Sequence, residues 1–416
     1  MKKFAIISTI LILLAAALFG YSLYHYLDVT GALDKREAVA TNTEATVAAA
    51  VNNAVKDDEQ PTEEKTAAAN TDGIFSAGTE KAAKYVESLS TEEMAGQLIL
   101  GICADASTAA EEMNKYNLSG MLFESGNFTY MTPEQVTEAI KTAQAKTNIK
   151  PILAAQEEGG AYTTISDLTG FTEYDFNPLR SEFESGGLQA AEKAEDQKIT
   201  MLKNVGFNLN LAPVVDVCSD GTQIMYSRSL SDDVEKVSAF AEYAAKFDQA
   251  KGVSVALKHF PGYGTVPDSA NTGVGAIEDD RTAESIRSVD YQPFKAGAEA
   301  GAHFIMMSNL LVKSMDPTHI ASLSPTLHNE LRDNVGFTGL IITDVLDDAD
   351  YSAYADGKKP VVQAVLAGND VILVRDYATA HADIVAAVKS GAITEDQLKA
   401  ACTRVIAYKY VAGIMS

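Results

Sequence analysis

Residues 321–344 read ASLSPTLHNELRDNVGFTGLIITD, and this stretch indicates how the folded part of the chain is built. Ser324 is suited to cap a helix, Pro325 fits its first turn, and Gly336 stands where such a helix would end. The apolar run Gly339–Ile342 follows at once. A helix followed directly by a short, continuously apolar strand is the repeating unit of parallel α/β folds.

Similar apolar runs recur along the chain, with stretches of helical period between most of them. They cover residues 97–103, 120–123, 151–155, 207–217, 253–257, 303–307, 339–342 and 370–374. Continuous apolar runs are typical of parallel strands that are buried on both faces. Eight strand–helix units predict a (β/α)8 TIM-type barrel. An open, doubly wound sheet is the alternative, but the G-x-G-x-x-G turn that often opens such sheets is absent.

The N-terminus predicts export or anchoring. Two lysines precede residues 4–27, which carry no formal charge and are long enough to span a bilayer as one helix. Residues 1–27 are therefore expected to be a signal or a transmembrane anchor. The length of the apolar stretch favours the anchor. Cleavage at the small-residue site Ala15-x-Ala17 is the alternative.

A change of composition separates this segment from the barrel. Residues 28–75 are rich in Ala, Thr and Glu and contain almost no large apolar side chain, so we expect a flexible, acidic linker. The barrel domain is expected to occupy residues 76–416. A positively charged flank followed by an apolar stretch places the N-terminus inside the cell. The protein is thus predicted to be extracytoplasmic, either membrane-anchored or secreted.

Charge and cysteine content exclude several classes of partner. The 33 basic and 57 acidic side chains give a formal charge of −24, which repels nucleic acid and anionic lipid surfaces. The three cysteines Cys103, Cys218 and Cys402 lie far apart and indicate neither a disulfide framework nor a zinc site. We expect no metal, no cofactor and a monomeric protein that binds the membrane only through its N-terminal segment.

Polar side chains follow five successive predicted strands. They are Gln156, Glu157 and Glu158, then Asp216, then Lys258 and His259, then Ser308 and Asn309, and finally Asp344. In a barrel the carboxyl ends of the strands face the site, so these groups are expected to meet there. A single carboxylate after a strand is more often a helix cap. The coincidence of five such strands indicates a site for a polyhydroxylated ligand.

Five motifs then carry a family resemblance. They are NLNLAPVVDV (208–217), YSRSLSDD (226–233), ALKHFPGYG (256–264), the stretch 321–344 and AVLAGNDVIL (364–373). In this order they resemble the catalytic barrel of glycoside hydrolase family 3, in particular its β-N-acetylhexosaminidase branch. The resemblance implies a retaining, β-N-acetylglucosaminidase-like hydrolase. Cell-wall or other extracellular glycans that contain amino sugars are the expected substrates.

The resemblance also implies roles for individual residues. Asp344 matches the nucleophile, and a carboxylate at this place can form a covalent glycosyl–enzyme intermediate. Lys258 and His259 match residues that bind the hydroxyls of the sugar in the −1 position, and Arg228 matches a sugar-binding arginine. Gln156, Asp216 and Asn309 complete the expected substrate-binding set.

The sequence departs from the family where the leaving group is protonated. The branch uses an Asp–His pair on the loop after the fifth strand, whereas this chain reads Asp268-Ser269-Ala270-Asn271. Asp268 is therefore the expected catalytic partner of Asp344, with Glu278 and Glu157 as other candidates. Gln156 also stands where the family has a sugar-binding Asp.

These departures leave other functions open. Loss of a general acid alone costs roughly 10²–10⁴ in rate, so a catalytically weak or inactive sugar-binding barrel is the main alternative. A lysine at a strand end, such as Lys258, also suits Schiff-base chemistry on a carbonyl substrate.

Overall fold

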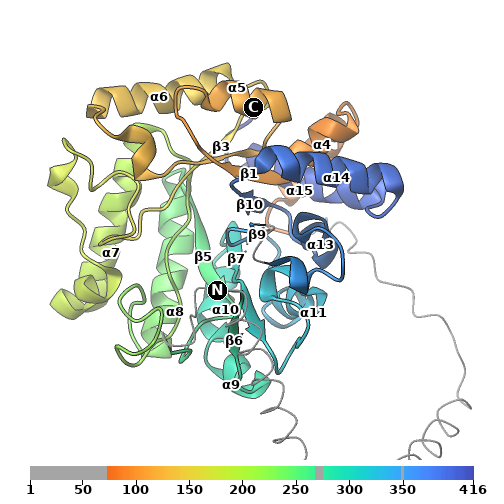
Figure 1. Cartoon of the computed structure of the whole chain (residues 1–416). Helices are drawn as coiled ribbons and strands as arrows, with labels where there is room; N and C mark the ends of the chain where they lie inside the picture. The colour runs from red at the N-terminus through yellow and green to blue at the C-terminus, as the bar shows by residue number, and fades with distance from the viewer. Residues whose placement is uncertain (1–72, 268–274, 348–350) are drawn as a thin grey trace, which may run out of the picture. The chain divides into compact units, whose positions relative to one another are not determined.

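The computed structural model describes residues 73–267, 275–347 and 351–416, all of which belong to one compact unit, Thr66–Ser416. Eight strands form its centre, in the order β10-β1-β2-β3-β4-β5-β7-β9 (Figure 1). They are β1 (Ile99–Ile102), β2 (Gly120–Leu122), β3 (Ile152–Ala155), β4 (Leu209–Asn210), β5 (Ser254–Phe260), β7 (Phe304–Met307), β9 (Leu340–Thr343) and β10 (Ile372–Val374).

The strands are all parallel and form a closed ring. Each pairs in parallel with its neighbours in that order. A parallel bridge between Ile342 and Val371 joins β9 to β10, where the N–H of Thr343 donates to the carbonyl of Val371 over 3.1 Å. The predicted barrel is therefore confirmed, and the open-sheet alternative is excluded.

Helices connect the strands and surround the ring (Figure 1). The connecting helices are α5 (Ala109–Tyr116), α6 (Pro133–Lys146), α7 (Leu179–Val205), α8 (Val234–Tyr243), α9 (Ala283–Ser288), α10 (Tyr291–Glu299), α11 (Pro325–Asn329) and α13 (Pro360–Ala367). Before and after the barrel lie α3 (Ser76–Val86), α4 (Thr91–Gln97), α14 (Tyr377–Ser390) and α15 (Glu395–Val411). Short helical turns are η1 (Ser125–Phe128), η2 (Thr172–Tyr174), η3 (Ala244–Asp248), η5 (Ala321–Leu323), η6 (Glu330–Asn334) and η7 (Ser352–Tyr354).

The stretch 321–344 folds as its residues predict. The hydroxyl of Ser324 accepts from the N–H of Leu327 over 3.1 Å and caps α11. The helix continues as the π-helical turn η6, and Gly336 then takes a left-handed φ of 79°. Strand β9 follows and is completely buried, because one face fills the barrel and the other meets the helices.

Each predicted apolar run overlaps one strand, but two runs differ in length. Run 207–217 yields only β4, because Pro213 has no N–H to donate and Val214 makes a single bridge to Lys258. Run 253–257 instead extends through β5 to Phe260. Cis peptide bonds precede Pro213, His259 and Pro261.

Two further features lie outside the ring of eight strands. A small parallel sheet of β6 (Ile277–Asp279) and β8 (Leu310–Val312) is formed by segments that follow β5 and β7. Near the start of the described residues, Phe75 is buried, with its ring centroid 5.5 Å from that of Tyr408 on α15. Phe75, the last residue of the predicted linker, is thus part of the packed fold.

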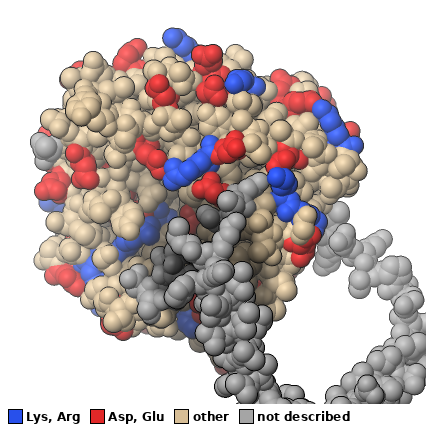
Figure 2. All heavy atoms as spheres, in the orientation of Figure 1, with Lys and Arg blue, Asp and Glu red and all other residues tan. Residues whose placement is uncertain are grey.

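The predicted signal or anchor (1–27) and residues 28–72 of the predicted linker lie outside the described residues. Within the described ranges, no helix combines the length and apolar character needed to cross a bilayer. Acidic and basic side chains are interspersed on the face shown in Figure 2.

Candidate active site

A cavity of about 410 Å³ opens at the carboxyl ends of the barrel strands. We call it the barrel-mouth cavity. Its polar lining residues are Gln156, Arg228, Lys258, His259, Tyr263 and Asp344. Its remaining lining residues are Tyr162, Ile224, Met225, Ile277, Met306, Val345 and Leu373. The structure therefore brings together five of the residues that the sequence predicted for the site.

Strand β5 supplies two adjacent side chains to this cavity. Consecutive residues of a regular strand point to opposite faces. The register of β5 against β7 shifts between Lys258 and Phe260, however, and this irregularity interrupts the alternation. Lys258 and His259 both line the cavity as a result, and both are almost completely buried.

A buried carboxylate, Glu158, organises the cationic side of the cavity. Its Oε1 lies 2.6 Å from the Nζ of Lys258 and 2.7 Å from the Nη2 of Arg228, and its Oε2 accepts from the Nε of Arg228 over 2.8 Å. The amide of Gln156 donates to the same Oε1 over 2.9 Å. Glu158 thus fixes three of the predicted sugar-binding side chains in one arrangement.

Burial and charge act against each other at this ion cluster. Burial opposes ionisation of Glu158, but the adjacent Lys258 and Arg228 hold the pKa of its carboxyl well below the usual range. Burial lowers the pKa of Lys258, although the neighbouring carboxylate of Glu158 opposes this shift. The cluster is therefore a charge-paired network whose N–H groups are available to ligand hydroxyls.

His259 is oriented by a second buried carboxylate. Its Nδ1 lies 2.9 Å from the Oδ2 of Asp216, whose Oδ1 accepts from the backbone N–H of Tyr263 over 2.7 Å. Because Asp216 occupies Nδ1, the other ring nitrogen of His259, Nε2, can interact with a molecule in the cavity. Asp216 is not among the residues that line the cavity, and it contacts His259 instead. Its role in substrate binding stays a prediction.

Asp344 follows β9 and is partly exposed in the cavity. Its backbone N–H donates to the carbonyl of Met307 over 2.8 Å, and its Oδ1 accepts from the N–H of Val345 over 2.7 Å. Burial raises the pKa of the Tyr263 phenol, and the nearby charge of Asp344 raises it further. The negative charge of Asp344 thus acts on the pKa of Tyr263 and also on the pKa of Lys258.

Asn309 has a different place from the one the sequence indicated. Its Nδ2 donates to the carbonyl of Val345 over 2.8 Å, and its Oδ1 accepts from the hydroxyl of Ser322 over 2.6 Å. Both ends of the amide are used within the fold, and the residue is not part of the cavity lining. Asn309 thus holds the backbone next to Asp344, and its contact with the substrate stays a prediction.

The three candidates for the proton donor differ in what the structure describes of them. Asp268 lies outside the described residues. Glu157 is completely buried, and its carboxylate accepts from the backbone N–H groups of Thr164 and Ile165, so it fastens a loop and does not line the cavity. Glu278 is exposed and pairs with Lys313 over 2.5 Å, also away from the cavity lining.

Among the residues that the structure describes, no group of His, Cys, Asp or Glu side chains is arranged to hold a metal ion. Cys218, which follows Asp216 closely, donates from its Sγ to the carbonyl of Gly264 over 3.3 Å.

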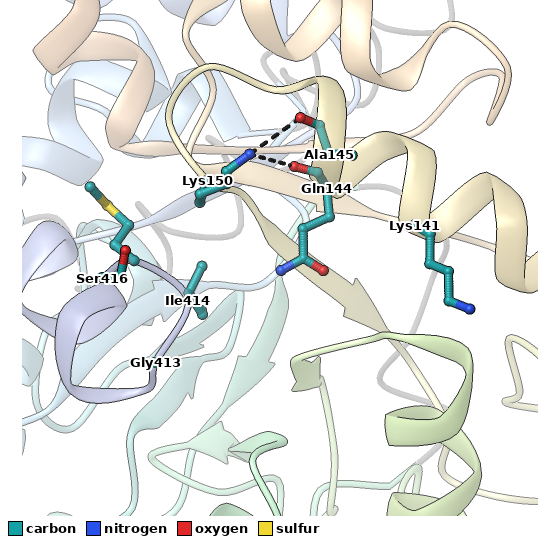
Figure 3. A pocket seen from close by; sticks show the side chains of 8 residues that line it. Lys141, Gln144, Ala145, Lys150, Gly413, Ile414 and Ser416 are labelled. Atoms are coloured by element: carbon teal, nitrogen blue, oxygen red, sulfur yellow. Dashed lines mark hydrogen bonds between the residues drawn. The ribbon is translucent and has the colours of Figure 1, made fainter.

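A second hollow, of about 370 Å³, lies at the opposite end of the barrel, where β3 begins (Figure 3). It is lined by Lys141, Gln144, Ala145, Lys150, Gly413, Ile414, Met415 and Ser416. The Nζ of Lys150 donates to the carbonyls of Gln144 and Ala145, so this lysine caps the end of α6. None of the residues that line this second hollow was predicted for the site, whereas five predicted site residues line the barrel-mouth cavity.

The comparisons with known proteins agree with this geometry. Residues 90–408 match the glycosyl hydrolase family 3 N terminal domain. The chain belongs to glycosyl hydrolase family 3. The predicted family, barrel fold and glycoside hydrolase class are thereby confirmed, and the alternative of an inactive sugar-binding barrel is not favoured.

The chain is also similar to proteins named as β-hexosaminidases and as a glycosyl hydrolase. The β-hexosaminidase of Stenotrophomonas maltophilia is 29% identical over 284 residues, covering 67% of this chain and 82% of that protein. The β-hexosaminidase of Xanthomonas campestris is 29% identical over 287 residues, covering 67% and 83%. An uncharacterized secreted glycosyl hydrolase of Arthroderma benhamiae is 30% identical over 226 residues, covering 52% and 64%.

Solved structures show the same fold. A family 3 β-N-acetylglucosaminidase from a Paenibacillus species superposes with a TM-score of 0.70 at 23% identity, covering 79% of this chain and 63% of that chain. The β-N-acetylhexosaminidase of Beutenbergia cavernae superposes with a TM-score of 0.67 at 26% identity, covering 78% and 99%.

Proposed function

We propose that this family 3 barrel is a retaining β-N-acetylglucosaminidase that removes an amino sugar from extracellular glycans, with Asp344 as its nucleophile. The observation that carries the proposal is the shared cavity: Asp344 lines the same space as Lys258, His259 and Arg228. A carboxylate beside several fixed hydroxyl-binding groups is the arrangement that glycoside hydrolysis needs. The names of the β-hexosaminidase relatives support the choice of sugar.

The side chains divide the work of binding. Lys258 and Arg228 present N–H donors that Glu158 holds in place, and Gln156 extends the same network. His259 presents the Nε2 of a ring that Asp216 orients. A sugar bound by these groups is fixed against rotation, so that its anomeric carbon can be held within reach of Asp344.

The reaction then needs two steps. An oxygen of the Asp344 carboxylate bonds to the anomeric carbon while the bond to the leaving oxygen breaks, and that oxygen takes a proton from an acid. A water molecule, deprotonated by the same group, next attacks the glycosyl ester and releases the sugar and the free carboxylate. We propose Asp268 as this acid and base, because Glu157 and Glu278 are engaged elsewhere.

The proposed location of the protein rests on its N-terminal sequence. We propose that residues 1–27 carry the protein out of the cytoplasm or anchor it, and that 28–75 link them to a monomeric barrel of residues 76–416. The uncharged stretch 4–27 and a relative named as secreted support this placement. The amino-sugar polymer of a cell wall is then the glycan within reach.

Activity on aryl N-acetyl-β-glucosaminides tests the proposal. Wild-type protein should release the aryl group, and Asp344→Asn should lose at least about 10³ in kcat, as removal of a nucleophile does. Asp268→Asn should slow substrates with poor leaving groups by about 10²–10⁴ and activated aryl glycosides much less. No cleavage by the wild type, or full activity of Asp344→Asn, would refute the assignment.

A further inference from the structure

Tyr162 differs from the other residues of the barrel-mouth cavity in its exposure. Lys258 and His259 are 2% and 4% exposed, whereas Tyr162 is 44% exposed and still lines the same cavity. The Lys258 and His259 side chains therefore occupy the deep part of the cavity, and the ring of Tyr162 lies at its outer part. A sugar gripped by Lys258 and His259 would extend its next unit past this ring.

The ring of Tyr162 is held on one side by a cation. The guanidinium carbon of Arg228 lies 4.2 Å from the centroid of the ring, a cation–π contact. Arg228 is itself fixed by two hydrogen bonds to Glu158, of 2.8 and 2.7 Å. The ring thus contacts the network proposed to bind the sugar, and its exposed surface can meet a ligand.

The backbone fixes Tyr162 as well. The N–H of Glu158 donates to the carbonyl of Tyr162 over 2.9 Å, and Gly159 forms an antiparallel bridge with Tyr162. Gly159 and Gly160 have φ values of 100° and 61°, and a Cβ on Gly159 would come within 2.3 Å of the carbonyl oxygen of Asn177. The turn that carries the tyrosine is therefore a built feature, and ordering its ring on binding costs little.

We propose that Tyr162 is the platform for the leaving sugar unit, stacking its ring on the C–H face of the residue that is released. This inference rests on the proposed function, because it assigns the second sugar of the same substrate. A pyranose ring presents apolar C–H groups on its faces, and these pack against an aromatic surface. The glycosidase is thereby selective for substrates whose leaving group is itself a sugar ring.

Two substrates separate this contact from the rest of the site. Di-N-acetylchitobiose carries a sugar leaving group, whereas N-acetyl-β-glucosaminyl fluoride has a leaving group of one atom. Tyr162→Ala should lower kcat/KM for the disaccharide about tenfold more than for the fluoride, which is the size of one aromatic contact. Tyr162→Phe keeps the ring and should keep the wild-type ratio of the two substrates. Tyr130→Ala removes a fully exposed tyrosine outside the cavity and serves as the matched control.

An equal loss for both substrates, or no loss for either, would overturn the platform. A binding measurement keeps this result separate from the proposed reaction. In Asp344→Asn protein, adding Tyr162→Ala should weaken calorimetric binding of di-N-acetylchitobiose about tenfold more than binding of N-acetylglucosamine. If the wild type cleaves neither substrate but this difference appears, the reaction is wrong and the platform stands. If neither sugar binds, or both affinities fall alike, the platform is wrong.

Discussion

The ammonium of Lys258, which lines the barrel-mouth cavity, lies 2.6 Å from the carboxylate of Glu158, and both side chains are almost completely buried. The same carboxylate also pairs with Arg228. A single anion therefore compensates two cations that the sequence identified as sugar-binding groups. Removing that anion affects both the stability of the barrel and the site.

Glu158→Gln should destabilise the protein by about 3–5 kcal/mol, because it leaves buried cations without a partner. It should also lower kcat/KM by at least about 10², since Lys258 and Arg228 lose their common anchor. Urea unfolding and aryl-glycoside kinetics measure the two effects. Glu278→Gln, which breaks an exposed pair with Lys313, is the control and should change stability by less than about 1 kcal/mol. A Glu158→Gln protein as stable and active as this control would show that Lys258 and Arg228 do not depend on this carboxylate.

Asp216→Asn tests whether Asp216 acts through the histidine. The carboxylate of Asp216 accepts from both Nδ1 of His259 and the N–H of Tyr263, whereas the neutral amide of Asn has only one oxygen to accept with. The imidazole ring of His259 should therefore lose its fixed orientation. We expect KM to rise and kcat/KM to fall about 10–100-fold. Steady-state kinetics check this, with Asp220→Asn on the same loop as control. Unchanged KM would show that His259 does not need this partner.

Arg281 clamps the turn that follows His259. Its Nη2 donates to the carbonyl of Gly262 over 2.6 Å, and its Nη1 pairs with Asp290 over 2.9 Å. Arg281→Gln should loosen this turn and lower kcat/KM about tenfold, while leaving secondary structure intact. Circular dichroism and kinetics measure both properties. Arg287→Gln, at a more exposed ion pair, should behave as the wild type; equal losses in both variants would argue against a specific clamp.

Asp248 predicts a particular dependence of stability on pH. It is completely buried, and neither carboxylate oxygen has a hydrogen-bond partner among the described residues. Burial, and then the nearby Glu195, raise its pKa to about 9. Because the unfolded value is about 4, the folded state holds the proton more tightly. The contribution of this bound proton to the free energy of unfolding is complete below about pH 4 and is lost as the pH rises toward about 9.

Asp248→Asn removes this titration. The variant should melt several degrees above the wild type at about pH 9, and the difference should shrink toward zero at about pH 4. Scanning calorimetry across this range gives the answer. A melting difference that stays constant with pH would show that Asp248 does not bind a proton on folding.

The sequence predicted the barrel because its evidence is local. Each strand is a short, continuously apolar run, and burial on both faces is what such runs predict. The length of β4 could not be predicted, since it depends on how Pro213 and Val214 meet β5. The closing contact between Ile342 and Val371 is likewise a matter of geometry in the whole ring.

The site was predicted in part, for a related reason. Strand ends indicated Lys258, His259 and Asp344, because the carboxyl ends of a barrel converge. Glu158 also stood at a strand end, but its partner Arg228 is 70 residues away, and their pairing is visible only in the fold. Asn309 also stands at a strand end, but its amide donates to the carbonyl of Val345, since the residue type does not say which side chain after a strand faces the cavity.

Covalent trapping of the nucleophile tests the role of Asp344 most directly. The protein is incubated with an activated fluoro-sugar of N-acetylglucosamine, digested, and examined by mass spectrometry. We expect the peptide containing Asp344 to gain the mass of the sugar, and Asp344→Asn protein to show no such gain. An adduct on a different carboxylate, or none with any of several fluoro-sugars, would contradict the assignment of Asp344 as the nucleophile.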